Sequence, residues 1–204
     1  MLKQTNKISS LVLIDFDGTI TNKDSFLDFI LFSNSITKLA LRSIYAILFF
    51  IAYKLKLMEN DPAKEKIFSI FFKNIPEKDL IESGEQYCRK KLQKILRKDA
   101  VETLHDHQRL EHTICIVTAS AGYWVKPWCD EDNYQLICTE YETGSGKMTG
   151  RYYGNNCRGI VKVNKIKEKY NLNDFTEIFC YGDTKDDLPM LELGTKKYYQ
   201  LFKL

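Results

Sequence analysis

Four short apolar runs without alternating polar residues limit what this chain can fold into. A strand with one solvated face alternates apolar and polar residues, whereas a strand buried on both faces of a parallel sheet is apolar throughout. Helical patterns lie between the later runs, so the order of elements predicts an α/β fold with a doubly wound, mainly parallel sheet. The runs are residues 11–14, 113–117, 135–138 and 178–181, residues 198–202 are expected to add a fifth strand at an edge, and the helical patterns cover residues 161–170 and 187–193.

Residues 21–98 break this alternation and predict an all-helical insertion after the first strand. Asp61 followed by Pro62 is a typical helix start, with Asp61 as the N-cap and the proline in the first helical position. A second helix is expected from Pro76, with Gly84 as a weak point within it. The insertion carries 15 Lys/Arg and 9 Asp/Glu, a balance of +6, and the rest of the chain carries 15 and 18, a balance of −3. Opposite balances favour two structural units.

One segment after the third run departs from the order of strands and helices. Residues 138–153 contain two arms rich in Thr and Tyr around Gly144-Ser145-Gly146. Glycine and serine suit a tight turn between antiparallel strands. The segment therefore predicts a β-hairpin after the third strand.

The composition excludes several classes of protein. The 204 residues are 44% hydrophobic, which suffices for a core, and a net charge of +3 is too small for a dedicated nucleic-acid binder. The six cysteines are scattered without a CxxC pair, so we expect small buried side chains and no disulfide framework. Residues 1–7 lack the apolar segment of a signal peptide. These features predict a cytoplasmic protein with reduced thiols and no nucleic-acid partner.

Two carboxylates follow the first apolar run, in the sequence Asp15-Phe16-Asp17-Gly18-Thr19. Ligands of open α/β sheets bind beyond the carboxyl ends of the strands. Asp15 and Asp17 are two residues apart, so in extended chain both carboxylates face the same side, which is costly unless a cation is present. Gly18 then permits a tight turn. The alternative is an ordinary polar turn at the end of a strand.

Further polar side chains stand at the ends of later runs. The second run ends at Thr118, the fourth ends at Asp183, and Asp187 follows four residues later. Lys162 lies between them, at the start of a predicted helix. Parallel strands bring their carboxyl ends to one edge of the sheet. A nucleophilic carboxylate, a second carboxylate, a hydroxyl, a lysine and a metal-binding acid pair are together the groups that phosphoryl transfer needs.

This ordered set resembles the four motifs of the haloacid dehalogenase (HAD) phosphatase superfamily, and the resemblance covers nearly the whole chain. Two further segments resemble its phosphoserine-phosphatase-like subclass IB. Thr118 replaces the commoner serine and keeps the hydroxyl. The four motifs are residues 15–19, 116–120, 156–163 and 182–191, and the two subclass segments are residues 20–26 and 124–129.

The resemblance implies an architecture as well as an activity. Residues 1–20 and 99–204 would form a Rossmann-like catalytic core, and residues 21–98 would form the helical cap of that subclass. Asp186 is an additional acid beside the fourth motif, and we expect it at a solvent-exposed helix start.

The resemblance also implies a two-step hydrolysis of phosphate monoesters. Asp15 would attack phosphorus and become an aspartyl-phosphate, and Asp17 would protonate the leaving alkoxide and then deprotonate water. Thr118, Ser120 and Lys162 would bind the substrate, with Lys162 offsetting charge in the transition state.

A Mg²⁺ cofactor follows from the same resemblance. The carboxylates of Asp15 and Asp183 and the backbone carbonyl of Asp17 would hold the ion, which prefers oxygen ligands. Asp187 would complete the metal site by holding Lys162 or a metal-bound water. The charges support this independently, because four clustered carboxylates without a metal and a lysine would repel one another and the phosphate.

The substrate stays open between two kinds of phosphate ester. A small phosphorylated metabolite similar to phosphoserine is our first prediction. The alternative is a phospholipid head group such as phosphatidylglycerophosphate at a membrane surface, because some members of the subclass act on it. An alternative of another class is a phospho-acceptor signalling module without turnover, against which Asp17 argues because it supplies an acid/base.

An uncharged apolar segment, residues 43–53, bears on that choice. Eleven residues are too few to cross a bilayer, which needs about 20, so we expect a buried cap helix. The alternative is a helix that lies on anionic lipid at the inner face of the membrane, since an apolar helix with basic flanks can bind there. The flanking residues are Lys38, Arg42, Lys54 and Lys56.

Several other residues have plainer interpretations. His105, His107 and His112 are expected to be solvated. Trp124 and Trp128 are one turn apart and are expected to pack between core and cap. Asp24 and Ser25, beyond the first motif, are expected to cap a helix, with substrate contact as the alternative.

Overall fold

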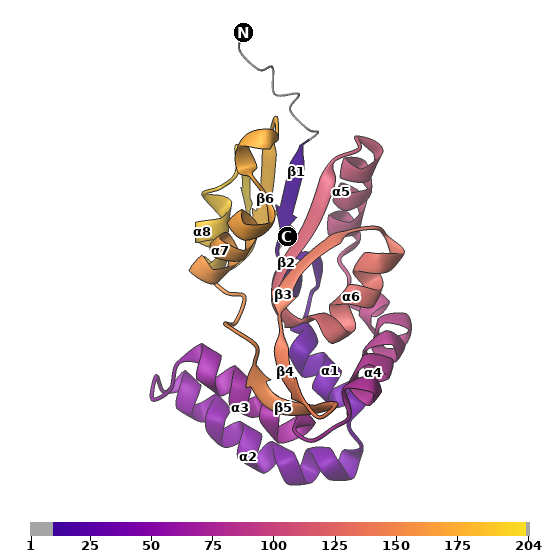
Figure 1. Ribbon diagram of the computed structural model, residues 1–204, viewed down its shortest axis with the longest axis vertical. Helices are drawn as coiled ribbons and strands as arrows, with labels where there is room; N and C mark the ends of the chain where they lie inside the picture. Colours follow the sequence, from indigo (N-terminus) through magenta and orange to yellow (C-terminus); the bar gives the residue numbers. More distant parts are fainter. Residues whose placement is uncertain (1–9, 203–204) are drawn as a thin grey trace.

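The computed structural model describes residues 10–202 and is built around a five-stranded parallel sheet (Figure 1). The strands lie in the order β3-β2-β1-β6-β7, and every neighbouring pair is parallel. The predicted α/β fold is therefore confirmed, although the edge strand begins before the predicted run. Residues 1–7, which carried the prediction about a signal peptide, lie outside the described residues. The strands are β1 (Leu11–Ile14), β2 (Thr113–Ala121), β3 (Gln135–Thr139), β6 (Ile178–Gly182) and β7 (Lys196–Tyr199).

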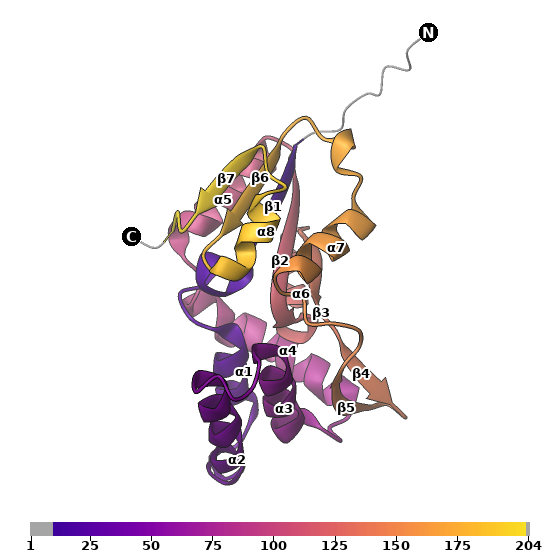
Figure 2. The ribbon, with the colours of Figure 1, turned by 90° about the vertical axis from the view of Figure 1, so that its left-hand side faces the viewer.

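Both faces of the sheet are covered, which explains why its central strand is apolar throughout. Val12 and Ile14 share one core cluster with Leu104, on the face of α5 (Lys98–Arg109) and α6 (Gly122–Glu131). Leu11 and Leu13 point the other way and share a second cluster with residues of α7 (Ile160–Lys169) and α8 (Leu188–Leu191). Figure 2 shows α7 and α8 on one side of the sheet. Three short helical turns lie in the connections, η2 (Leu92–Lys94), η3 (Leu172–Asp174) and η4 (Lys185–Asp187).

Of the α-helices between β1 and β2, the first four form a helical cap beyond one end of the sheet (Figure 1). They are α1 (Ser25–Ser33), α2 (Ile36–Lys54), α3 (Asn60–Phe72) and α4 (Glu77–Lys90). The predicted start at Asp61 is wrong, because α3 begins at Asn60 with Glu59 as its N-cap. The Asp61 carboxylate accepts a hydrogen bond from Asn156 Nδ2 at 2.6 Å, so it connects cap and core.

Aromatic rings and a close backbone approach join the cap to the core. Trp124 of α6 stacks on Phe29 of α1 with ring centroids 4.5 Å apart, and both rings are buried, as predicted for Trp124. Gly84 of α4 is no weak point, because a Cβ there would lie 1.8 Å from the carbonyl oxygen of Tyr123. The missing side chain lets α4 and α6 meet backbone to backbone.

The predicted hairpin consists of β4 (Tyr141–Gly144) and β5 (Lys147–Tyr152), which pair antiparallel. It packs against α3 of the cap. Tyr141 stacks on Phe68 of α3, and the backbone N–H of Asn74 donates to the Met148 carbonyl at 2.9 Å. The hairpin therefore extends the surface on which the cap rests.

Helix α2 differs from its prediction. It is described in full, and none of its side chains is buried, so the expected burial of residues 43–53 is wrong. The reason is that one side of α2 packs on α3 while the opposite side has no neighbour among residues 10–202. The helix extends beyond residues 43–53, and its 19 residues are long and apolar enough to cross a membrane. Among residues 10–202 no other helix is.

Two groups of polar or reactive side chains complete the description. All six cysteines are free, and five are buried, in agreement with the prediction. His105 is exposed as predicted, but His107 lies 6% exposed on the inner face of α5, so the prediction of a solvated side chain is wrong for it. Its ring nitrogens lie 2.8 Å from His112 Nδ1 and 2.8 Å from Tyr181 Oη.

Candidate active site

Asp15 is placed by the end of β1 and by the single turn η1 (Phe16–Ile20) that follows. Its backbone N–H still pairs with the neighbouring strand, donating to the Tyr181 carbonyl at 3.0 Å. The carboxylate is buried at the carboxyl ends of the strands, which we call the sheet edge. There Thr19 Oγ1 donates to Asp15 Oδ2 at 3.2 Å and also lies 3.0 Å from Asp183 Oδ1. Burial raises the pKa of Asp15 to about 7, although the charge of Lys162 opposes this shift.

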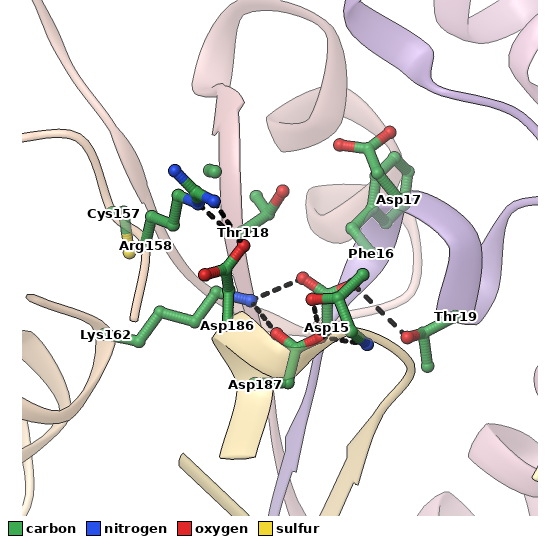
Figure 3. A network of polar contacts seen from close by, with 12 residues as sticks. Asp15, Phe16, Asp17, Thr19, Thr118, Cys157, Arg158, Lys162, Asp186 and Asp187 are labelled. Atoms are coloured by element: carbon green, nitrogen blue, oxygen red, sulfur yellow. Dashed lines mark hydrogen bonds and ion pairs between the residues drawn. The ribbon is translucent and has the colours of Figure 1, made fainter. Parts of the chain in front are cut away.

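Lys162, at the start of α7, connects two of the predicted carboxylates (Figure 3). Its Nζ lies 2.5 Å from Asp15 Oδ1 and 2.7 Å from Asp187 Oδ1, and all three side chains are at least nine-tenths buried. Burial lowers the pKa of Lys162, but the two carboxylates outweigh it and hold the pKa above its ordinary value. The lysine therefore stays charged beside Asp15.

Asp187 is fixed by the turn η4 and by Lys162. Its Oδ2 accepts hydrogen bonds from the N–H and hydroxyl of Thr184 at 2.9 and 2.8 Å and from the Asp183 N–H at 3.2 Å. Burial raises the pKa of Asp187, but Lys162 and Thr184 hold it below its ordinary value. A Cβ on Gly182 would lie 2.4 Å from the Asp187 Cβ, so this tight arrangement needs glycine.

The Asp17 carboxylate lies apart from these acids, on the cap side (Figure 3). Asp17 Oδ1 accepts from the Ser25 N–H at 2.7 Å, and Oδ2 accepts from Ser120 Oγ at 2.5 Å. Burial and then the nearby Asp24 raise the pKa of Asp17, which favours a carboxyl group that can hold a proton. Gly18 follows directly, and its φ of +89°, which suits glycine, turns the chain after Asp17.

Thr118 and Ser120 stand at the end of β2, next to β1 in the sheet. Both are fully buried, and Thr118 Oγ1 accepts from the Ser120 N–H at 2.9 Å. The Ser120 hydroxyl is 3.2 Å from Ser25 Oγ, which in turn accepts from Trp124 Nε1 at 2.9 Å. Ser120 and Ser25 thus surround Asp17, while Asp24 caps α1 by accepting from the Leu27 N–H.

Three carboxylates form a cluster that can hold a cation. Single oxygens of Asp15, Asp183 and Asp187 lie within 4.8 Å of one another, and all three residues are buried. Lys162 supplies one positive charge against three negative ones, so a divalent ion would balance the cluster. A carboxylate oxygen set also suits Mg²⁺. The residues therefore fit the predicted metal, with the Asp17 carboxylate outside the cluster.

Two cations near these acids, Lys64 of the cap and Arg158 of the core, are not singled out by the sequence pattern. Lys64 Nζ of α3 donates to the Ala119 carbonyl at 2.9 Å, and its charge lowers the pKa of Asp17, opposing the effect of burial. Arg158, before α7, lies 2.7 Å from Asp186 and 3.8 Å from Asp61 of the cap. Asp186 thus lies in η4, at a helix start as predicted, and pairs with Arg158.

Comparison with known proteins identifies the arrangement. The model of the family described as haloacid dehalogenase-like hydrolase matches residues 12–192, which include every strand-end residue above. The chain belongs to the haloacid dehalogenase-like hydrolases. Membership confirms the resemblance drawn from the motifs.

One curated relative and two solved structures match nearly the whole chain. Protein CicA of Caulobacter vibrioides is 28% identical over 205 residues, covering 95% of this chain and 86% of its own. A Bordetella pertussis protein of unknown function has a TM-score of 0.81 at 24% identity, covering 93% of this chain and 88% of that chain. A phosphoserine phosphatase solved as a phospho-aspartyl intermediate analogue has a TM-score of 0.61 at 18% identity, covering 97% and 90%. The fold is therefore shared with these two solved structures.

Proposed function

We propose that this HAD-like hydrolase is a Mg²⁺-dependent phosphatase of phosphate monoesters that works through an aspartyl-phosphate on Asp15. The observation that carries the proposal is the contact between Asp15 and Lys162 at 2.5 Å, with Asp17 held separately by Ser120 and Ser25. The two acids therefore have different environments, as a nucleophile and an acid/base require. In this proposal residues 21–98 are the cap, and residues 1–20 and 99–204 are the core.

The residues of the chain supply each step. Asp15 Oδ attacks phosphorus, the bond to the ester oxygen breaks, and Asp17 gives its proton to the leaving alkoxide. Asp17 then takes a proton from the water that attacks the aspartyl-phosphate, which releases phosphate and restores Asp15. Thr118, Ser120 and Lys162 bind phosphate oxygens, and Lys162 offsets the charge that develops there.

Magnesium belongs to the same proposal. Asp15 and Asp183 would hold it with the backbone carbonyl of Asp17, and Asp187 would position Lys162 or a metal-bound water. When bound, the ion neutralises phosphate charge and orients the ester for in-line attack. The buried carboxylate cluster supports this assignment.

Two substrates fit the proposal. A small phosphorylated metabolite similar to phosphoserine comes first, because the fold resembles that of a phosphoserine phosphatase. A phospholipid head group such as phosphatidylglycerophosphate is the second candidate, and the apolar exposed side of α2 favours it. Assays with both esters would distinguish them.

The decisive experiment is hydrolysis of an aryl phosphate by the purified chain with Mg²⁺ and with EDTA. We expect turnover with Mg²⁺, none with EDTA, and a loss of about 10⁴-fold or more for Asp15→Asn, because the nucleophile is removed. Asp130→Asn is the matched control, since Asp130 is exposed and pairs with Lys126 at the surface. Full turnover by Asp15→Asn would overturn the proposal. A phosphoprotein that lasts for many minutes without turnover would favour the phospho-acceptor alternative.

A further inference from the structure

The solvent side of α2 is apolar along its length. Leu41, Ile44 and Leu48 are 70%, 64% and 61% exposed. These residues follow the spacings of three and four that place side chains on one side of a helix. We call this surface the α2 face and define it as Leu41, Ile44, Tyr45, Ile47, Leu48 and Ile51, all of which are exposed.

The polar residues of α2 are distributed in the opposite way to those of an ordinary surface helix, which turns its charges to water. Arg42, in the middle of the helix, turns inward and donates from Nη1 to the Phe71 carbonyl at 2.8 Å. Leu39, Ala46 and Phe49 are partly buried against the cap core on the same side. The packing of α2 on α3 therefore uses only one side and leaves the α2 face outward.

The charges around the α2 face are of one sign. No carboxylate occurs between Asp28 and Glu59, a stretch that contains four cations. Lys38, Lys54 and Lys56 are exposed at the two ends of the helix. Lys54 also lies over the Phe50 ring, with Nζ 5.4 Å from its centroid. An apolar strip with basic ends is complementary to a surface that is apolar inside and negatively charged outside.

We propose that the α2 face docks on an anionic lipid bilayer, with the helix lying in the plane of the interface. Docking would bury the apolar side chains at the level of the acyl chains while the lysines meet lipid phosphates. A second copy of the chain fits less well, because apposed α2 faces would bring the cationic ends together without an acidic partner. Helix α3 covers the other side of α2, which favours docking over insertion across the bilayer.

This inference is independent of the proposed phosphatase activity. The α2 face contains none of the residues at the sheet edge, and α3 lies between α2 and that edge, since Lys64 of α3 reaches the Ala119 carbonyl. A variant of the α2 face should therefore keep its turnover of a soluble aryl phosphate. That turnover also reports correct folding.

The test is co-sedimentation of the purified full chain with vesicles. We expect binding to vesicles of equal parts phosphatidylglycerol and phosphatidylcholine, and much weaker binding to phosphatidylcholine alone. Ile44→Glu should weaken binding to the anionic vesicles by about tenfold or more, because a carboxylate enters the apolar strip. Leu110→Glu is the matched control, since Leu110 is also 64% exposed but lies on the core. It should bind like the unchanged chain.

Other outcomes would overturn the proposal. Absence of binding to anionic vesicles, or equal loss in Ile44→Glu and Leu110→Glu, would contradict docking through α2. A dimer that Ile44→Glu dissociates, without vesicle binding, would assign the α2 face to a second copy. Resistance of the bound chain to extraction by alkaline carbonate would indicate a membrane-spanning α2. If the unchanged chain does not hydrolyse aryl phosphate, the proposed activity is contradicted, but the proposal of docking through α2 is unaffected.

Discussion

The sheet edge and helix α2 depart from the usual distribution of side chains in opposite ways. At the sheet edge Asp15, Asp187 and Lys162 are charged and buried, whereas on α2 Leu41 and Ile44 are apolar and exposed. Burying charges and exposing apolar side chains both cost free energy of folding. The two regions therefore indicate binding surfaces, one for a small charged ligand and one for an extended apolar layer.

The largest effect is expected at the buried charges. Lys162→Met should lower the free energy of unfolding by about 3–5 kcal/mol, because Asp15 and Asp187 would stay buried without their cation. Urea denaturation measures this, and added MgCl₂ should restore part of the loss. Lys167→Met, on an exposed position of the same helix, should change little. A loss below about 1 kcal/mol in Lys162→Met would mean that the buried charges are not coupled as described.

Two isoleucines, one buried in the sheet and one exposed on α2, test the difference between the two regions directly. Ile116→Ala in β2 should cost about 2–5 kcal/mol, because it leaves a cavity at a fully buried position. Ile44→Ser on α2 should stay within about 0.5 kcal/mol in the absence of lipid. Thermal and urea denaturation of both variants give the two values. An equal loss of stability in both variants would show that the α2 face is covered by protein in solution.

Gly84 tests how the cap is attached. Gly84→Ala should destabilise the chain by about 1–3 kcal/mol, because the new Cβ would meet the Tyr123 carbonyl and force α4 away from α6. Gly154→Ala is a control with open space around the position, although its positive φ adds some strain. If both variants lose the same stability, the close approach of α4 and α6 contributes little.

The smallest effect concerns the buried histidine of the core. Burial, followed by the charge of His112, lowers the pKa of His107 to about 4, with Asp106 opposing the shift. Because the unfolded chain binds this proton more readily, with a pKa near 6.5, stability should fall as the pH drops from 6.5 toward 4. Between pH 7.5 and pH 5 the loss is about 2 kcal/mol.

Denaturation curves of His107→Gln and His105→Gln at both pH values isolate this effect. The first variant should lose that part of the pH dependence, and the second should keep it, since His105 is exposed. A wild-type profile that stays flat down to pH 5 would contradict the shifted pKa.

Much of the site could be predicted from the sequence because strand ends fix it locally. Asp15 follows an apolar run, and Asp183 and Thr118 follow two others, so the parallel sheet brings them to one edge. The prediction of a helical insertion after the first strand is also confirmed, because its signals lie within short stretches of sequence. Lys64, by contrast, reaches the Ala119 carbonyl only through the docking of the cap, which no short motif encodes.

Several of the errors share a physical cause, since they depend on how a helix meets its neighbours in the fold. The pattern of α2 and that of a buried helix are alike, and only the position of α3 decides which side is covered. His107 was predicted to be solvated because its spacing from His105 does not reveal which of the two faces β6. Asp61 has the chemistry of an N-cap, but Asn156 of the core takes its carboxylate.

The inward position of Arg42 fixes how α2 is rotated about its own axis. Turning the helix to hide its apolar side would break the bond from the guanidinium to the Phe71 carbonyl and leave that carbonyl without this donor. The apolar side therefore stays outward even when no lipid is near. A dilute solution of this protein should consequently behave like a mild surfactant, which collects at air–water boundaries and on the walls of plastic vessels.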